Sequence, residues 1–182
     1  MEIYKTPIDG LIVLEPKVFQ DDRGYFLESF HAGRYKELGM DAGFIQDNES
    51  KSVRGVIRGL HYQLAPHAQA KLVRVIEGSV FDVAVDLRKG SPTFGQWFGV
   101  ELTGENKKQL FIPRGFAHGF SVLSETAVFS YKCDNYYHPE SERGIIYNDP
   151  DLKIDWKIPE PEAIISAKDQ KNSLFREADI NF

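Results

Sequence analysis

Cysteine and long apolar runs are both scarce in this sequence. Among its 182 residues the only cysteine is Cys133, so an intramolecular disulfide is impossible and a reducing compartment is expected. No stretch approaches the ~18 consecutive apolar residues of a membrane span. The first residues also lack the apolar core of a signal peptide. These absences together predict a cytoplasmic protein that has no membrane partner.

Several common catalytic motifs are also missing. The chain contains no Gly-rich phosphate loop, no Cys-x-x-Cys pair and no Gly-x-Ser-x-Gly elbow. NTP hydrolysis, a zinc ribbon and a serine hydrolase are therefore unsupported. The net charge of −5 argues against non-specific binding to nucleic acid, so no nucleic-acid partner is predicted. A local cationic pocket for a small anion is compatible with this charge.

The composition that remains is typical of one folded domain. Apolar residues make up 42%, charged residues 27% and aromatic residues 13% of the chain, and the aromatic share favours strands. Single hydrophobic cores stop growing only near ~250–300 residues, which is well above this length. No repeat, low-complexity tract or linker interrupts the sequence. We therefore expect residues 1–182 to form a single domain.

Short apolar runs separated by turn residues predict an all-β fold. Turns are expected at Glu77-Gly78 and over residues 90–92. A short helix is expected near residues 32–40, where apolar residues recur at helical spacing, and another over residues 169–178. Regularly spaced strands favour a sandwich or a barrel with a few short peripheral helices. The expected strands cover residues 11–14, 25–30, 71–76, 79–87, 96–102, 109–112, 119–123 and 127–133.

Two segments that contain histidine carry the clearest chemical signal. Residues 58–63 read Arg-Gly-Leu-His-Tyr-Gln, and residues 113–118 read Pro-Arg-Gly-Phe-Ala-His. A histidine can accept a proton near neutral pH, but either one alone could equally be a hydrogen-bonded core histidine or a loop residue. With Glu77-Gly78 between them, the two segments match the paired pattern of a cupin jelly roll, in which the site lies inside the mouth of the barrel.

The cupin pattern raises the question of a metal ion. Metal-binding cupins place a second histidine where this chain has Gln63, and glutamine is a poor transition-metal ligand beside imidazole. We therefore predict no metal. His61, His118 and His67 could still form a loose site, so a metal-dependent cupin oxygenase stays open as an alternative.

Further segments narrow the interpretation through their number and order. They are Arg-Gly-Leu-His-Tyr-Gln (58–63), Ala-Gln-Ala-Lys-Leu-Val-Arg (68–74), Phe-Asp-Val-Ala-Val-Asp-Leu-Arg (81–88), Ser-Pro-Thr-Phe-Gly (91–95), Ile-Pro-Arg-Gly-Phe-Ala-His-Gly-Phe (112–120) and Asn-Asp-Pro (148–150). In these segments the chain resembles the dTDP-4-dehydrorhamnose 3,5-epimerase family, along nearly its whole length. The resemblance implies a cofactor-free homodimer that inverts C3 and C5 of dTDP-4-dehydro-6-deoxy-D-glucose.

The same resemblance implies four catalytic roles. His61 matches the general base, and Asp169 matches the carboxylate that orients it. Lys71 matches the cation beside the sugar's keto oxygen, and Tyr131 matches the general acid on the opposite face. Without the resemblance, Asp169 is better interpreted as a helix N-cap and Lys71 as a solvated lysine at a strand end. A strand tyrosine such as Tyr131 would most simply be a barrel aromatic.

The resemblance also implies a set of positions that bind the nucleotide sugar. Arginine suits a diphosphate because its planar fork binds two oxygens at once, and Tyr137 matches an aromatic that stacks on thymine. Family dimers pack their N-terminal strands across the interface, so Arg23, Phe26 and Glu28 could reach the partner's site. His31 and His138 match no catalytic position and are expected at the surface. The set is Arg23, Phe26, Glu28, Gln46, Asn48, Arg58, His118, Tyr137, Glu142 and Lys168.

Two further alternatives stay open at the level of sequence. Related enzymes on the same scaffold epimerise only one carbon or isomerise the keto group, and they use the same base and acid. A non-catalytic module that binds nucleotide sugars would keep the binding residues and lack turnover. The motifs discriminate poorly among these possibilities.

Overall fold

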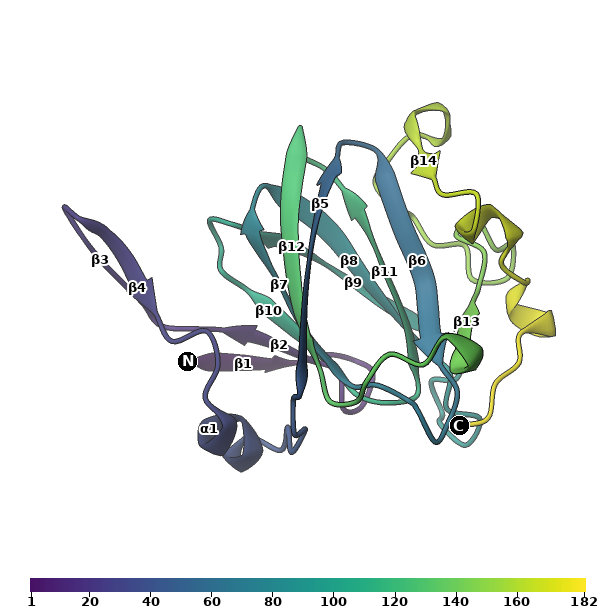
Figure 1. Ribbon diagram of the computed structural model, residues 1–182, viewed down its shortest axis with the longest axis horizontal. Helices are drawn as coiled ribbons and strands as arrows, with labels where there is room; N and C mark the ends of the chain where they lie inside the picture. The colour runs from purple at the N-terminus through teal and green to yellow at the C-terminus, as the bar shows by residue number, and fades with distance from the viewer.

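The computed structural model describes residues 1–182 and consists mainly of two antiparallel sheets that pack face to face (Figure 1). The first sheet has the strand order β1 (Glu2–Lys5), β2 (Ile12–Glu15), β10 (Gln109–Ile112), β7 (Lys71–Glu77), β12 (Thr126–Cys133) and β5 (Gln46–Val53). The second sheet has the order β13 (Glu142–Gly144), β6 (Val56–Gln63), β11 (Phe116–Val122), β8 (Ser79–Asp86) and β9 (Trp97–Thr103). The prediction of an all-β cupin jelly roll is confirmed.

Two small elements lie outside this sandwich of sheets. Strand β14 (Ile164–Ile165) runs parallel to β6 and extends the second sheet at its edge. Strands β3 (Val18–Asp21) and β4 (Gly24–Leu27) form a hairpin that projects away from the body, at the left of Figure 1. All eight hairpin residues except Leu27 are exposed, so the rest of the chain does not bury the hairpin.

Helical structure is limited to short peripheral pieces. The α-helix α1 (Ala32–Glu37) begins after His31, whose ring accepts a hydrogen bond from the Arg34 backbone N–H. Four single turns of 3₁₀-helix complete the set, namely η1 (Pro139–Ser141), η2 (Glu160–Glu162), η3 (Asp169–Lys171) and η4 (Phe175–Glu177). None of these helices is long and apolar enough to cross a membrane.

Apolar side chains fill three layers of this fold. The central core lies between the sheets and includes Val73, Leu110 and Phe129. A second cluster around Trp156 packs the C-terminal segment on the outer face of the second sheet. A third cluster around Tyr35 packs α1 and its flanking loops against the first sheet. The C-terminal segment is therefore fixed beside β6, which matters for the site described below.

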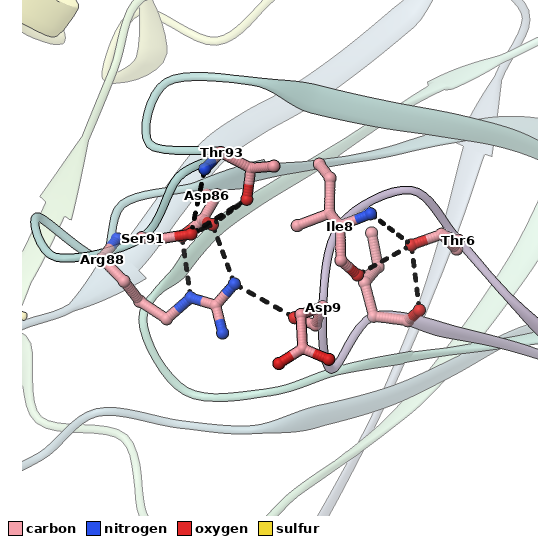
Figure 2. A network of polar contacts seen from close by, with 8 residues as sticks. Thr6, Ile8, Asp9, Asp86, Arg88, Ser91 and Thr93 are labelled. Carbon is pink, nitrogen blue, oxygen red and sulfur yellow. Dashed lines mark hydrogen bonds and ion pairs between the residues drawn. The ribbon is translucent and has the colours of Figure 1, made fainter.

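One buried carboxylate ties the end of β8 to the N-terminal loop (Figure 2). Asp86 accepts two hydrogen bonds of 2.8 Å from the Arg88 guanidinium and further ones from the Ser91 and Thr93 hydroxyls. Arg88 in turn donates to the backbone carbonyl of Asp9 at 3.0 Å. Burial alone would raise the pKa of Asp86, but these hydrogen bonds outweigh it and lower the pKa to about 2.

Several expected elements differ from those observed. Strands β1, β3, β5, β6, β13 and β14 were not expected, and the strand predicted for residues 25–30 ends at Leu27. The predicted helix over residues 169–178 is wrong, because only the turns η3 and η4 form there. Between them the backbone is extended at Asn172, Ser173 bridges to Ile145, and the Phe175 N–H donates to Asp149. These tertiary contacts use the backbone groups that a continuous helix would need.

Candidate active site

The two sheets enclose a cavity of about 530 Å³ between them. Its walls come from β6 and β11 in the second sheet, from β7 and β12 in the first, and from the segment that follows β14. A smaller cavity of about 240 Å³ adjoins it, and the two share His61, Lys71 and Tyr131. The shared side chains make the two hollows lobes of one site.

His61 lies on β6 and forms a short polar contact in the larger lobe. Its Nε2 is 2.7 Å from Oδ1 of Asp169, which η3 in the C-terminal segment provides. Asp169 is buried, and it also accepts from the Gly59 backbone N–H. Burial raises the pKa of Asp169, but the hydrogen bond with His61 and the other contacts reverse this and hold it below the usual value. The carboxylate therefore stays ionised at neutral pH and orients the imidazole.

An irregular pairing of β6 with β11 brings two functional side chains to the same side. Arg58 and His61 are three residues apart, so they would face opposite sides of a regular strand. The register shifts between His118 and Phe120, where the backbones of Gly59 and Gly119 meet. A Cβ on Gly59 would lie 2.6 Å from the Gly119 Cα, so no larger residue fits at this close approach. As a result, both Arg58 and His61 line the cavity.

The first sheet supplies Lys71 and Tyr131 from the neighbouring strands β7 and β12. The Lys71 Nζ lies 5.8 Å from the centroid of the Tyr131 ring. Burial lowers the pKa of Lys71, whereas Asp82 and Glu142 act in the opposite direction. Burial also raises the pKa of Tyr131, so its phenol stays protonated at neutral pH. Because Tyr131 and His61 belong to facing sheets, an acid and a base approach the cavity from opposite sides.

A second histidine–carboxylate pair borders the same lobe, which His118 lines. His118 on β11 places its Nε2 3.0 Å from Oδ2 of Asp82 on β8, and both side chains are buried. Burial raises the pKa of Asp82 and lowers the pKa of His118, although each partner's charge opposes the shift. Asp82 is not among the residues predicted from the sequence. An acidic residue inside the apolar run Ser79–Asp86 was the available signal, since a buried carboxylate requires a partner.

The smaller lobe contains the polar residues predicted for the nucleotide end. Gln46 and Asn48 come from β5, and Glu142 begins β13. The Glu142 carboxylate accepts from the Tyr137 hydroxyl at 2.7 Å and from the Lys168 ammonium at 2.5 Å. Burial raises the pKa of Glu142, but the hydrogen bond from Lys168 reverses this and lowers it. Lys168 also lines the larger lobe, so it connects the two halves of the site.

Three predicted binding residues lie away from this site in their own chain. Arg23 and Phe26 are on the projecting hairpin, and Glu28 follows it. Arg23 is held by Asp21 at 2.6 Å, and Glu28 is held by Arg34 at 2.7 Å. The other eleven predicted residues line the two lobes: Gln46, Asn48, Arg58, His61, Lys71, His118, Tyr131, Tyr137, Glu142, Lys168 and Asp169.

The remaining histidines are not arranged as metal ligands. His67 stacks on His138 with 3.7 Å between ring centroids, and its Nδ1 lies 2.8 Å from the Ser141 hydroxyl. No three His, Cys, Asp or Glu side chains are grouped so that they could hold a metal ion. His31 is exposed, as expected. His138 is partly exposed and partly covered by the stack.

A family model described as dTDP-4-dehydrorhamnose 3,5-epimerase matches residues 5–177 of this chain. The chain belongs to this epimerase family. A Shigella flexneri dTDP-4-dehydrorhamnose 3,5-epimerase is 53% identical over 180 residues, which cover 98% of both chains.

Solved structures of epimerases also match closely. A crystal structure of the dTDP-4-dehydrorhamnose 3,5-epimerase from Elizabethkingia anophelis is 57% identical, with a TM-score of 0.94 and coverage of 97% of each chain. The structure of a dTDP-6-deoxy-D-glucose-3,5-epimerase from Legionella pneumophila has the same identity and TM-score and contains dTDP-4-keto-L-rhamnose. That comparison covers 98% of this chain and 94% of the Legionella chain.

Proposed function

We propose that this protein converts dTDP-4-dehydro-6-deoxy-D-glucose to dTDP-4-dehydro-L-rhamnose by inverting C3 and C5. The observation that carries the proposal is that His61 and Tyr131 approach one cavity from facing sheets. Inversion of a carbon requires a base on one side of it and an acid on the other. The names of the relatives and the ligand in the Legionella enzyme support this substrate.

The first step is abstraction of a proton next to the 4-keto group. Asp169 occupies Nε2 of His61, so Nδ1 of the imidazole is the nitrogen that takes the proton from C3 or C5. The electron pair of the broken C–H bond moves toward C4, and the keto oxygen becomes an enolate oxygen. Lys71 stabilises the charge on this oxygen, because a fixed cation inside a cavity acts more strongly than in water.

The second step returns a proton to the opposite face. The Tyr131 hydroxyl donates its proton to the same carbon, the C=O double bond forms again, and the configuration is inverted. The resulting phenolate and imidazolium then exchange protons with solvent, which restores both groups for the second carbon. The raised pKa of Tyr131 suits this role, because the donor must carry its proton before the enolate forms.

The two lobes divide the substrate between sugar and nucleotide. We assign the larger lobe to the keto sugar, since His61, Lys71, Tyr131 and Asp169 line it. Arg58 and Lys168 supply positive charge for the diphosphate, and the Arg58 Nε is oriented by the Ser52 hydroxyl at 3.1 Å. Tyr137 at the edge of the smaller lobe stacks on thymine, and Gln46, Asn48 and Glu142 bind polar groups nearby.

We also propose that the active form is a homodimer. Phe19, Tyr25 and Phe26 are exposed on the projecting hairpin, and exposed aromatic clusters of this kind mark interaction surfaces. Arg23, Phe26 and Glu28 then complete the site of the partner subunit rather than their own. Each subunit, residues 1–182, acts as one domain in the cytoplasm. No metal or cofactor takes part, because the substrate's keto group already acidifies the protons to be removed.

A product assay by NMR tests the proposal against its nearest alternatives. Incubation with dTDP-4-dehydro-6-deoxy-D-glucose should give a product inverted at both C3 and C5. Inversion at one carbon only would identify a single-centre epimerase, and migration of the keto group would identify a ketoisomerase. Binding without proton exchange would identify a non-catalytic module. A loss of turnover on exhaustive chelation, restored by one divalent ion, would support the metal-dependent alternative.

A further inference from the structure

The segment that carries Tyr137 has unusual backbone support. Tyr136, Tyr137 and His138 follow β12 but belong to no strand or helix. Their three backbone N–H groups donate to amide side chains, namely to the Oδ1 of Asn135, the Oε1 of Gln46 and the Oε1 of Gln63. Backbone donors must find partners, and here side chains rather than a strand supply them. The orientation of the segment therefore depends on these amides.

Gln63 is the buried member of these amides and makes three hydrogen bonds to the backbone. Its Oε1 accepts from the His138 N–H at 2.6 Å, and its Nε2 donates to the Tyr136 carbonyl at 3.2 Å. The same Nε2 donates to the His67 carbonyl at 2.6 Å. The residue is only 4% exposed, and these three hydrogen bonds use both donors and the acceptor of its amide. Gln63 thus hydrogen-bonds to the residues on both sides of Tyr137 and connects them to the end of β6.

The stacked rings of His67 and His138 further stabilise the backbone around Tyr137. Gln63 binds the backbone of both histidines, and their rings stack at a centroid distance of 3.7 Å. The His67 ring also contacts the Ser141 hydroxyl in η1, which lies beyond Tyr137 in the sequence. The segment is held before and after Tyr137, while the Tyr137 ring itself remains 50% exposed. A fixed backbone with a free aromatic face is suited to stacking on a flat ligand.

The chemistry of the position explains why it is a glutamine. Two donors and one acceptor must converge at the end of one buried side chain, and a primary amide supplies them. A carboxylate has no donor for the two carbonyls, and an imidazole cannot present two donors and an acceptor at one point. Gln63 occupies a metal-ligand position of the cupin pattern, but here both donors and the acceptor of its amide are hydrogen-bonded to the backbone.

We propose that Gln63 is a positioning residue that presents the Tyr137 ring to the nucleobase of the substrate. This inference rests on the proposed function, because it needs a thymine-containing ligand in the smaller lobe. Gln63 borders the smaller lobe, but its amide is bonded to the backbone on both sides of Tyr137, so we assign its effect to the placement of that ring. Pre-organisation of an aromatic platform favours binding because the ordering cost has been met before the ligand arrives.

A double-mutant cycle on dTDP binding tests this inference by calorimetry. Tyr137→Ala removes the stacking ring and should weaken dTDP binding by at least about tenfold. Gln63→Met keeps the length and burial of the side chain without its hydrogen bonds, and should weaken binding by about tenfold as well. In the Tyr137→Ala background, Gln63→Met should cause almost no further loss. Non-additivity of this kind separates action through Tyr137 from a general structural effect.

The neighbouring residue Tyr62 provides a matched control. Its hydroxyl donates to the Asp179 carbonyl at 2.7 Å, so Tyr62→Phe also deletes a buried hydrogen bond on β6. This variant should bind dTDP as the unmodified protein does. Hydrogen–deuterium exchange of the His138 amide should accelerate in Gln63→Met and stay unchanged in Tyr62→Phe. If Gln63→Met does not fold, Gln63→Glu serves in its place, since it keeps the acceptor and loses both donors.

Two outcomes would overturn the inference. One is dTDP affinity in Gln63→Met or Gln63→Glu equal to that of the unmodified protein. The other is a full tenfold loss from the Gln63 substitution in the Tyr137→Ala background, as expected for independent sites. Neither outcome depends on turnover, so the product assay can fail while this cycle succeeds, and the reverse. The two proposals are therefore tested separately.

Discussion

We assign His61 and Tyr131 to different proton transfers, so their variants should behave differently in deuterated water. His61→Ala removes the base and should abolish both epimerisation and deuterium uptake, because no enolate forms. Tyr131→Phe keeps the base, its carboxylate and Lys71. It should still take up deuterium at the face that His61 serves, while inversion at one or both carbons is strongly impaired. Mass spectrometry and NMR of the recovered sugar measure the two quantities together.

The comparison also has a clear negative outcome. If Tyr131→Phe loses deuterium exchange as completely as His61→Ala does, the assignment of base and acid to opposite faces is wrong. Tyr131 would then be a binding or structural residue of the cavity wall.

Lys71 is the only lysine that both lobes share, and its charge faces the proposed enolate oxygen. Lys71→Met keeps the length of the side chain and removes the charge, so kcat should fall by about 10²–10³. Lys132→Met is a matched control, because that lysine is next to Tyr131 on β12 but pairs with Asp47 outside the cavity. A Lys71→Met enzyme with near-normal kcat would remove Lys71 from the mechanism.

At the scale of elements, the Asp86 network predicts how stability responds to acid. A carboxylate whose pKa is lowered on folding stabilises the protein above its unfolded pKa, near 4, and loses this effect as the pH falls toward about 2. The depression corresponds to about 2 kcal/mol at neutral pH. Asp86→Asn should therefore destabilise the protein at pH 7 by about 2 kcal/mol, and the difference should narrow by about 1 kcal/mol at pH 3.

Urea unfolding at the two pH values measures this difference. Asp151→Asn is the control, because Asp151 is exposed and its side chain forms no ion pair. The free energies of unfolding of the unmodified protein and Asp86→Asn could differ by the same amount at pH 7 and pH 3. That result would show that the charge of Asp86 does not contribute to stability. The loss would then come from packing or from the neutral hydrogen bonds alone.

The elements that could be predicted from sequence are those whose apolar residues indicate that they are buried. Strands β7, β8, β10 and β12 carry apolar residues that reach the core, and turn residues bound them, so their positions were predicted to within a few residues. Strand β5 contains a single apolar residue, Val53, and was missed. Its inward side chains meet a polar cavity, and its strand structure comes from the full ladder with β12. Periodicity cannot reveal a wall of this kind.

The site was predictable through motifs but not through physical pattern alone. His61 and Asp169 are 108 residues apart, and nothing in the spacing joins them. Asp169 lies in a segment that was expected to be a helix, and contacts of Ser173 and Phe175 override that local preference. The partnership of His118 with Asp82 was not foreseen, because strand pairing decides which inward residues of β8 and β11 meet.

At the scale of the whole molecule, the projecting hairpin predicts complementation between inactive subunits. His61→Ala lacks the base, and Arg23→Ala lacks a binding residue that we place in the partner's site. In a mixed dimer, one site combines an intact His61 with the intact Arg23 of the partner subunit. Co-refolding equal amounts of the two variants should therefore restore activity at about a quarter of all sites, given random pairing into two-fold dimers.

The alternative arrangement gives a different result. If Arg23 served its own subunit, every site in the mixture would carry one of the two defects and no activity would return. Sedimentation of the mixture provides the control, because it shows whether dimers formed at the concentration of the assay.

The distance in sequence between His61 and Asp169 also has a consequence for the time course of folding. The two residues are 108 positions apart, and the segment between them includes every strand from β7 to β13, so the pair closes a very long loop. Contacts of this kind form late, since the chain must first lose the entropy of the intervening segment. During synthesis the barrel strands emerge before η3 does. We expect the cavity of a newly made chain to form before Asp169 orients His61. The chain should therefore become catalytically competent only in the last stage of folding.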